Sequence, residues 1–510
     1  MKLFQYLIGY LCFILASTYP LLAQADNTGE ITVEIEQTVQ SGNYLLAVPP
    51  KTISSSSTIQ LIRKGERITA RVSPQLLWPE NTISAGNKHY IRLLNIHFSQ
   101  PPAIERRYQL KWQSGENNPM PESPVNQPNS FGLMTAEQGW LSRSLLLHPE
   151  NKGNYSEWYL GSQRKYALYI TDRELLSKRN YPLSKASQWL YDSPQALYQL
   201  YVMTQEPMWK PKADFMSLYY QDHIDDTGYF DHKPRDIKYL NGRGLLFRYM
   251  LNGDPESIKA LKRLFQASLK WNPVYSLERG FWTERHQAAA LSTALAYWEA
   301  SNDPKALKRI NEIVDATYTM TFDSAWSNRN CPQHALKAHE GKGDQSAVCS
   351  PWMMSLLADS LWRFYHLTQS QKAEELIIAF GEFVLKDGTY YPREPKLKGQ
   401  ILSMYLWVPD NPKAIEINGW RDLQHNCDIA ALVGKATFLK KQQKKDYASM
   451  KELFEIFAER CRKNHVKSPK TIQAALKPLR KFGWEYSSTS DMPWLVEELL
   501  DWKGISVHRP

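Results

Sequence analysis

Several sequence patterns that would assign a function directly are missing from this chain. It contains no GxxxxGK[ST] or HExxH, no GxSxG, and no GxGxxG after a predicted strand. Nucleotide-binding, zinc-protease and serine-hydrolase functions therefore have no support. After residue 25 no apolar run is long enough to cross a bilayer. Cysteine is scarce, with 5 residues in 510, and no CxxC pair occurs. We predict neither a cofactor nor a metal ion.

The first 25 residues have the composition of a targeting segment. Lys2 precedes the apolar run LFQYLIGYLCFILAS, and the small residues Ala23 and Ala25 follow it. This order predicts a secretory signal peptide over residues 1–25, cleaved after Ala25. A single membrane anchor is the alternative, although the run is short for a span. We expect a periplasmic or secreted protein without stable membrane insertion.

The cysteines agree with export. Cys12 would leave with the signal peptide, and an even set of four remains: Cys331, Cys349, Cys427 and Cys461. An oxidising compartment favours two disulfides. Of the three possible pairings, we favour the first cysteine with the second and the third with the fourth. A zinc site using His334 and His339, which lie between the first two cysteines, is the competing interpretation.

Composition changes along the chain and divides it into segments. Residues 26–114 contain short alternating runs such as ITVEIEQ, NYLLAVP and YIRLLNIHF, separated by Gly, Pro and Ser, which predict an all-β domain. Residues 115–130, rich in Pro, Asn and Ser, predict a linker. Residues 131–182 form a mixed connecting segment, with RSLLLHP and RKYALYIT as strand candidates. From residue 183 to 510 the apolar spacing is helical.

A helical unit returns along the C-terminal part of the chain. An aromatic-rich helix, a short polar turn and a second helix begin near Gly242, again near His286 and again near Trp352. A repeated helical hairpin cannot bury its apolar face alone, so the units must stack or close into a ring.

Parts of the sequence resemble a known family. The segments SGNYLLAVPP, IQLIRKGERITARVSPQLLWPENT, HYIRLLNIHF and RRYQLKW are similar to the N-terminal domain of the exo-rhamnogalacturonan lyase-like family. The matching positions include Gly65, Ala70, Val72, Trp78 and Pro79. TERHQAAALSTALAYWEASNDPKAL resembles that family's histidine-bearing helix.

This resemblance covers residues 40–112 and 235–310 and implies a small β-barrel before an α/α toroid. The chain departs from the family after the helices, where no long β-sandwich is evident, so no catalytic set is transferred. We predict an α+β multidomain protein, with an N-terminal all-β domain followed by a mainly helical (α/α)6-type toroid.

The richest polar segment is QDHIDDTGYFDHKPRDIKYLNGRG, residues 221–244. From it we select Asp226, Arg235, Asp236, Tyr239 and Arg243 as candidates. Spacings of three and four place the last three on one face of the helix that follows. The alternative is a solvated loop with a local Asp–Arg ion pair.

A second group of polar residues opens a predicted helix at WTERHQAAALS. It supplies Trp282, Glu284, Arg285 and His286 as candidates. An ordinary helix start, with Thr283 as the cap, explains Glu284 but leaves the other three unexplained.

Further candidates lie in INGWRDLQHNCDIAAL and FGWEYSSTSDMPW. The first segment offers Trp420, Arg421 and His425, and its Asp422 is spaced to hydrogen-bond His425. The second offers Trp484. A helix start held by a disulfide at the neighbouring cysteine is an equally good interpretation of the first segment.

Two chemistries suit these candidates. In β-elimination a base removes the proton beside a uronate carboxylate, a cation stabilises the dianion, and an acid protonates the leaving oxygen. The residues selected for these roles are His286, Tyr239, Arg243 and Arg285. In hydrolysis two carboxylates flank the bond, and the selected pair is Asp226 and Glu284. The remaining candidates are assigned to substrate binding: Arg235, Asp236, Trp282, Trp420, Arg421, His425 and Trp484.

Charge indicates the class of partner. The net charge of +10 and pI near 9.0 favour an acidic polymer such as a uronate glycan. Export argues against a nucleic-acid partner. We predict an exported polysaccharide lyase acting on an acidic glycan; the alternatives are a glycoside hydrolase and a non-catalytic polysaccharide-binding or export accessory protein.

Overall fold

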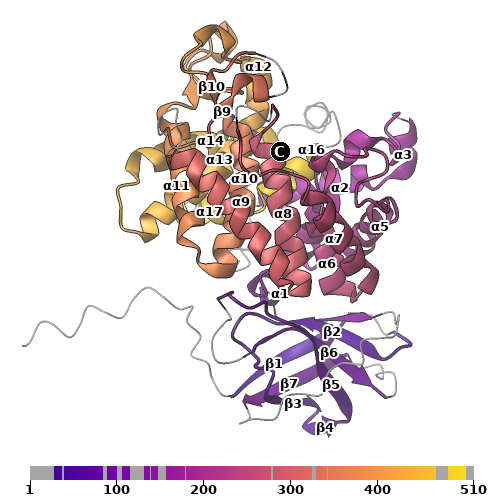
Figure 1. Cartoon of the computed structure of the whole chain (residues 1–510). Helices are drawn as coiled ribbons and strands as arrows, with labels where there is room; N and C mark the ends of the chain where they lie inside the picture. Colours follow the sequence, from indigo (N-terminus) through magenta and orange to yellow (C-terminus); the bar gives the residue numbers. More distant parts are fainter. Residues whose placement is uncertain are drawn as a thin grey trace, which may run out of the picture.

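The computed structural model shows a β-domain beneath a larger helical domain (Figure 1). It describes residues 28–36, 39–83, 89–99, 106–114, 131–137, 139–147, 157–178, 180–276, 280–323, 329–339, 341, 343–466 and 481–500. The predicted signal peptide, residues 1–25, and the predicted linker, residues 115–130, lie outside the described residues. Within the described part of the chain, no helix combines the length and apolarity needed to cross a bilayer.

The N-terminal domain is one eight-stranded, nearly closed sheet, as predicted. Its strand order is β4-β3-β7-β1-β8-β2-β6-β5, and every pairing is antiparallel except that of β2 with β8. Residues alternate in and out along β1, where Ile31, Val33 and Ile35 are buried. The strands are β1 (Thr28–Ile35), β2 (Asn43–Ala47), β3 (Ser57–Arg63), β4 (Glu66–Ile68), β5 (Ala70–Leu77), β6 (Ile91–Phe98), β7 (Arg107–Ser114) and β8 (Gly132–Thr135).

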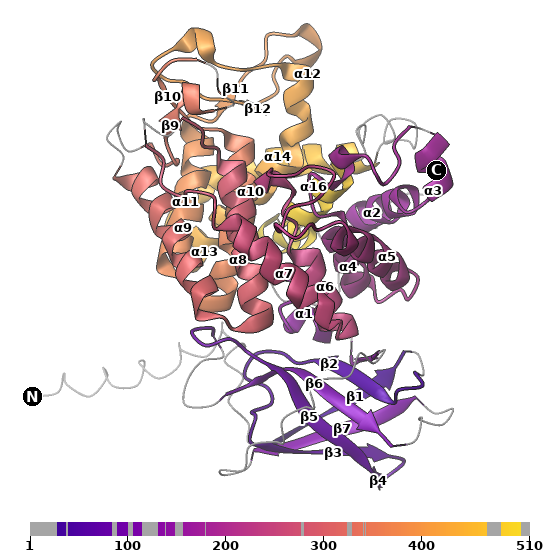
Figure 2. The same ribbon diagram turned by 45° about the vertical axis from the view of Figure 1, so that its right-hand side comes forward.

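The helical domain, which stands above the β-domain in Figure 2, is a closed ring of helical hairpins, and this confirms the predicted toroid. Each inner helix packs on the next, and the last packs on the first. The inner helices are α4 (Ser193–Thr204), α6 (Arg243–Asn252), α8 (Glu284–Ser301), α10 (Pro351–Thr368), α13 (Asn426–Gln442) and α16 (Lys481–Ser488). The outer helices are α2 (Glu157–Ile170), α5 (Trp209–Asp222), α7 (Pro255–Ser268), α9 (Pro304–Phe322), α11 (Gln371–Lys386) and α14 (Ala448–Val466).

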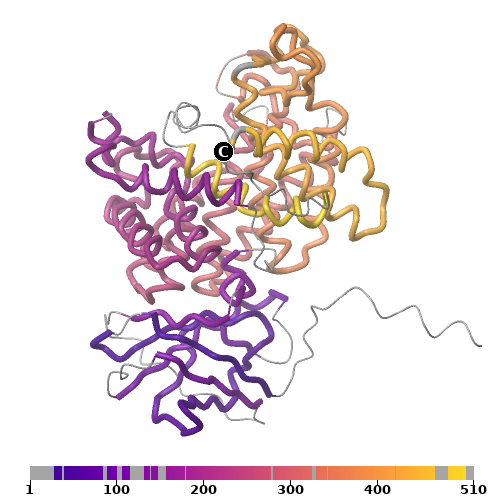
Figure 3. Tube along the Cα trace, turned by 180° about the vertical axis from the view of Figure 1, so that it is seen from behind, coloured from indigo at the N-terminus to yellow at the C-terminus, as the bar shows by residue number. Residues whose placement is uncertain are grey.

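Figure 3 shows from behind where the ring closes, with α16 against α2 and α4. The short helices α1 (Trp140–Arg143), α3 (Arg173–Lys178), α12 (Gly419–Asp422) and α17 (Met492–Leu500) lie outside the inner ring. The C-terminal α17 packs on α13 and α14.

The recurring polar turns connect each inner helix to the outer helix that follows. In three of these turns a residue in the left-handed region ends the first helix, and the next side chain caps the second by accepting a backbone N–H bond. These pairs are Gly253 and Asp254, Asn302 and Asp303, and Gln369 and Ser370. The repeat seen in the sequence is therefore this turn together with its two helices.

The connecting segment differs from its prediction. RKYALYIT was expected to be a strand, but it lies in α2, and RSLLLHP contains the end of α1 and a turn. In α2 the side chains of Tyr159, Gln163, Tyr166 and Ile170 are buried, at spacings of three and four. That helical period, rather than the alternation within the short run, determined the structure.

The β-domain packs against the ends of the inner helices where the short turns lie. Arg92 of β6 donates from Nη1 to the carbonyl of Glu299 in α8 at 3.0 Å, and it also pairs with the Glu299 carboxylate. Arg363 of α10 donates from Nε to the same carboxylate at 2.8 Å. We call this end of the ring the short-turn end.

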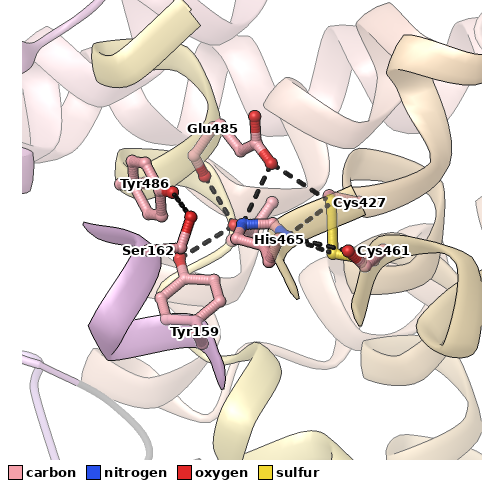
Figure 4. Close-up of a disulfide and its surroundings, with 8 residues drawn as sticks. Tyr159, Ser162, Cys427, Cys461, His465, Glu485 and Tyr486 are labelled. Carbon is pink, nitrogen blue, oxygen red and sulfur yellow. Dashed lines mark hydrogen bonds and ion pairs between the residues drawn. A yellow bond between two sulfur atoms is a disulfide. The ribbon is translucent and has the colours of Figure 1, made fainter. Parts of the chain in front are cut away.

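The opposite end, which we call the long-loop end, carries the long connections from outer to inner helices. Two small hairpins lie there: β9 (His334–Ala335) with β10 (Ala347–Val348), and β11 (Thr389–Tyr390) with β12 (Leu402–Ser403). Both favoured disulfides are formed, Cys331–Cys349 in the first of these loops and Cys427–Cys461 between α13 and α14 (Figure 4).

Candidate active site at the long-loop end

The inner helices all begin at the long-loop end, because outer and inner helices alternate around the ring. Residues near the starts of α8, α10, α13 and α16 are therefore brought together although they are far apart in sequence. Helix starts also present unpaired backbone N–H groups and the positive end of the helix dipole. This end is accordingly the part of the fold best suited to bind polar or anionic groups.

Five aromatic side chains gather there, and we call them the aromatic cluster: Tyr191, Trp352, Tyr405, His425 and Trp484. The ring of Trp352 stacks on His425 with centroids 4.9 Å apart, and lies 5.5 Å from Trp484 and 5.6 Å from Tyr405. Trp484 in turn stacks on Tyr191 at 5.6 Å. Faces and edges of this kind suit contact with sugar rings.

The two tryptophans of the cluster have unused donors. Trp352 is only 4% exposed and Trp484 only 7%. Even so, neither indole N–H has a hydrogen-bond partner among the described residues. A buried donor without a partner costs free energy unless a ligand or water satisfies it. Sugar hydroxyls are suitable acceptors.

His425 is held by a carboxylate on the same helical turn. Its Nδ1 lies 3.0 Å from Asp428 Oδ2, and both side chains are almost fully buried. If Nδ1–H donates to Asp428, Nε2 carries a lone pair. That nitrogen lies 3.4 Å from Gln424 Nε2, which can donate to it only weakly. In that tautomer the arrangement directs Nε2 as the proton acceptor.

Arg285 adds a positive charge to the cluster. Its guanidinium lies 5.6 Å from the Trp352 ring centroid and is partly buried. No carboxylate of the described residues lies within 4.0 Å of it as an ion pair. The exposed Arg421 lies 5.9 Å from the Tyr405 ring. Two cations beside stacked aromatic rings favour an anionic ligand.

Asp422 does not pair with His425, contrary to the prediction. Its carboxylate accepts from the Tyr390 hydroxyl at 2.6 Å and from the Asn418 backbone N–H at 2.7 Å. Asp422 and Asp428 each lie three residues from His425 along the chain. Only Asp428 belongs to the regular helix α13, and the helix fixes the direction of its side chain. The side chain of Trp420 lies outside the described residues.

The candidates of residues 221–244 are not on one helical face. Asp236 caps the 3-10 helix Ile237–Tyr239, the backbone is extended at Leu240, and Arg243 begins α6. The expectation of a continuous helix was wrong because the Asp236 carboxylate accepts the Lys238 N–H and starts a separate short turn. Asp226 and Arg235 are exposed in the preceding loop.

Arg243 instead faces the interior of the ring. Its guanidinium lies 3.1 Å from Asp359, which also pairs with Lys435 at 2.9 Å. Lys435 lies 3.5 Å from Asp491, and burial raises the pKa of that carboxyl to about 6. In this buried network the two cationic side chains are paired with the two carboxylates.

The remaining candidates near the start of α8 are buried. Trp282 is buried and donates to the Pro273 carbonyl at 3.3 Å. His286 Nδ1 lies 2.6 Å from Thr283 Oγ1, and burial holds the pKa of its ring well below the usual range. Glu284 is fully buried and accepts the Ser350 N–H at 2.8 Å, and burial raises its pKa to about 8.

Sequence reasoning selected Arg285, Arg421, His425 and Trp484 but not Trp352 or Tyr405. A signal for Trp352 was present, because it stands at the start of the third repeat helix, as Glu284 and Arg285 do in the second. Tyr405 lies in a long loop, where no period marks the facing side chains.

A separate cavity of about 450 Å³ lies on the β-domain. Its lining includes Glu34 and Arg107, which are mostly exposed and lie 3.5 Å apart. Such a solvated pair needs no ligand. The cavity therefore lacks the unpartnered buried groups that mark the long-loop end.

No protein-family model matches the chain, and no curated protein matches it. Solved structures that it resembles include a cellobiose 2-epimerase from Bacillus thermoamylovorans B4167, at 11% identity and TM-score 0.40, over 56% of this chain and 77% of that one. An unsaturated glucuronyl hydrolase from Bacillus sp. GL1 matches at 11% and 0.44, over 67% and 97%. A polysaccharide lyase matches at 10% and 0.42, over 66% and 98%. The resemblance to the exo-rhamnogalacturonan lyase-like family stays a prediction, and the function below rests on the residues of this chain.

Proposed function

We propose that this protein is an exported polysaccharide lyase that cleaves an acidic, uronate-containing glycan by β-elimination at the aromatic cluster. One observation carries the proposal: Arg285, which has no carboxylate partner among the described residues, and His425, held by Asp428, both pack on Trp352. A cation and an oriented base on one aromatic platform are the groups that proton removal beside a carboxylate needs.

Each group has a role in the elimination. Trp352 and Trp484 stack on sugar rings and donate their indole N–H groups to hydroxyls. Arg285 binds the uronate carboxylate and stabilises the negative charge that develops when the neighbouring proton leaves. His425 Nε2 accepts that proton from C5. The electron pair of the C5–H bond forms the C4–C5 double bond as the C4–O glycosidic bond breaks.

The leaving oxygen must receive a proton. Tyr405 is the candidate acid, because its ring centroid lies 6.2 Å from that of His425 and its side chain is partly exposed. The products are a shortened chain with a new hydroxyl and a sugar with a conjugated double bond. No water is consumed, so the atoms balance without a co-reactant.

Hydrolysis is the alternative chemistry, and it needs two carboxylates across the bond. Asp428 is engaged with His425, and Asp422 is engaged with Tyr390. Of the pair selected from the sequence, Asp226 is exposed and Glu284 is fully buried. The side chains at the cluster therefore suit elimination better than hydrolysis.

Export is part of the proposal. The predicted signal peptide supports it, and so do the two disulfides, which are typical of oxidising compartments.

A panel of uronate-containing and neutral polysaccharides tests the function. We expect ultraviolet absorbance from the conjugated product together with new reducing ends, on a uronate polymer only. Reducing ends without absorbance would mean hydrolysis. Binding without either signal would mean a non-catalytic polysaccharide-binding protein.

A further inference from the structure

We propose that Glu284, His334 and His339 form a binding site for a divalent transition metal ion of the zinc type, which fastens the loop closed by Cys331–Cys349 to helix α8. The inference does not depend on the proposed lyase activity.

The three side chains already have the geometry of a metal site. One ligand atom from each lies within 4.8 Å of the other two. These contacts use different nitrogens of His334: Nε2 lies 2.8 Å from His339 Nδ1, whereas Nδ1 lies 3.9 Å from Glu284 Oε1 and 3.3 Å from the Pro332 carbonyl. Ligand atoms around a tetrahedral zinc ion are about 3.4 Å apart, so a bound ion would use one nitrogen of His334 and draw the three ligand atoms closer together. Two imidazoles and a carboxylate leave one position for water.

Unpartnered atoms provide a second, independent observation. Glu284, His334 and His339 are 0%, 0% and 4% exposed. Even so, Glu284 Oε2 and His339 Nε2 have no hydrogen-bond partner among the described residues. A buried polar atom left in this state destabilises the folded protein, and a bound cation would satisfy it.

The charges also fit a cation. Glu284 can supply a negatively charged oxygen ligand, and His334 and His339 can each supply a nitrogen ligand. Neutral imidazoles are the form that binds metal. Arg285 follows Glu284 in the chain, and its positive charge opposes binding, whereas ionised Glu284 favours it.

The surroundings hold the ligands in place. The disulfide and the pairing of β9 with β10 close the loop that carries both histidines. The backbone N–H of Trp282 donates to the Ala338 carbonyl at 3.1 Å, and the Trp282 ring lies 5.0 Å from that of His334. Supporting contacts of this kind orient metal ligands.

Two other groups of potential ligands are less suitable. Cys427 and Cys461, near His465, are joined in a disulfide and offer no thiolate. His223 and His232, near Asp231, are more exposed, and their rings already contact the Tyr219 carbonyl and hydroxyl.

Metal content tests the proposal without any activity assay. The full-length mature protein is treated with a chelator, titrated with zinc chloride by calorimetry, and analysed for bound metal after dialysis. We expect one equivalent of zinc and a higher melting temperature. Glu284→Gln and His339→Gln should each lower the affinity at least tenfold. His286→Asn, a buried histidine of the same helix, is the matched control and should keep the full equivalent.

Less than one equivalent in the wild-type protein, or equal binding by Glu284→Gln, would overturn the proposal. X-ray absorption of the zinc-loaded wild-type protein keeps the test valid if the variants do not fold. We expect nitrogen and oxygen ligands with two imidazoles, and sulfur ligands would contradict the site.

Discussion

The guanidinium of Arg285 lies 5.6 Å from the centre of the Trp352 ring, at the junction of two inner helices that both begin at the long-loop end. Arg285 follows the first residue of α8, and Trp352 follows the first residue of α10. The packing of α8 on α10 therefore brings together a cation and an aromatic face separated by more than sixty residues. The proposal that the substrate is acidic depends on this pair.

Replacing Arg285 should remove the stabilisation of the developing charge. We expect Arg285→Gln to lower kcat/KM on a uronate polymer by about 10²–10³-fold, the usual effect of losing one such donor. Arg285→Lys should retain part of the activity. Arg67→Gln is the control, because Arg67 is an exposed residue of β4 in the other domain, and it should change kcat/KM little. Equal rates for wild type and Arg285→Gln would remove Arg285 from the mechanism.

The indole donors of the cluster should contribute to glycan binding. Trp352→Phe and Trp484→Phe keep a ring but lose the N–H, so each should weaken binding of an acidic oligosaccharide about fivefold, equivalent to about 1 kcal/mol. Calorimetry measures this. Trp362→Phe is the matched control, because Trp362 is fully buried in α10 and also has an unpartnered N–H. If all three variants bind equally, the unpartnered donors do not mark the site.

His425 and Asp428 should act together. We expect His425→Asn to lower kcat by about 10²–10⁴-fold, because it removes the base. Asp428→Asn should lower kcat less and change the pH dependence of the rate, since it alters only the orientation and protonation of the ring. His366→Asn, at a partly buried histidine of α10, serves as the control. A normal pH–rate profile in Asp428→Asn would contradict the paired role.

Glu299 should make the stability of the protein depend on pH through the contact between the two domains. Burial alone would raise its pKa, but Arg363 and Arg92 outweigh burial and lower the pKa to about 2. A lowered pKa means that this stabilisation is complete above the ordinary value of 4.5 and is lost as pH falls towards 2. Glu299→Gln leaves two buried arginines with a poorer partner, so we expect a loss of about 3–5 kcal/mol at pH 7.

Denaturant titrations between pH 2 and pH 7 measure the effect of Glu299→Gln. The variant should also lose less stability than wild type as the solution is acidified. Wild-type stability at pH 7 in the variant would show that the cluster of Arg92, Glu299 and Arg363 does not hold the domains together.

Glu485 should have the opposite pH dependence. It lies beside the Cys427–Cys461 disulfide, with Oε1 3.1 Å from His465 Nε2 (Figure 4). Burial, and then the charge of Asp428, raise its pKa to about 8. Its stabilisation is therefore complete below the ordinary 4.5 and is lost as pH rises through 8.

Glu485→Gln keeps the shape of this side chain without the charge. We expect it to gain about 1–3 kcal/mol over wild type at pH 8, an amount reduced because 23% of the Glu485 side chain is exposed, and to gain little at pH 5. Melting curves of the wild-type protein and the variant at pH 5 and pH 8 measure this difference. A variant less stable than wild type at pH 8 would mean that Glu485 is ionised and paired in the folded protein.

The sequence predicted correctly the elements that a local repeating pattern of residues determines. The hairpins beginning near Gly242, His286 and Trp352 were recognised because each turn repeats a left-handed residue followed by a cap. The strands RSLLLHP and RKYALYIT were wrong because a short alternating run resembles part of a buried helix. The break at Leu240 was missed because a single capping aspartate, Asp236, decided it.

The candidate site was predicted only in part, because it forms between helices that are distant in sequence. Arg285 and His425 were found as polar residues at helix starts. Trp352 and Tyr405 were not, because an aromatic residue at a helix start or in a loop has no local feature that distinguishes contact with a ligand from packing in the core.

The mass of the products released from a uronate polymer tests the central claim most directly. Elimination leaves every new chain end formed at C4 one water molecule lighter than hydrolysis would. We predict products with this deficit from the wild-type protein and none from His425→Asn. Products that carry the added water would contradict elimination and assign the aromatic cluster to a hydrolase.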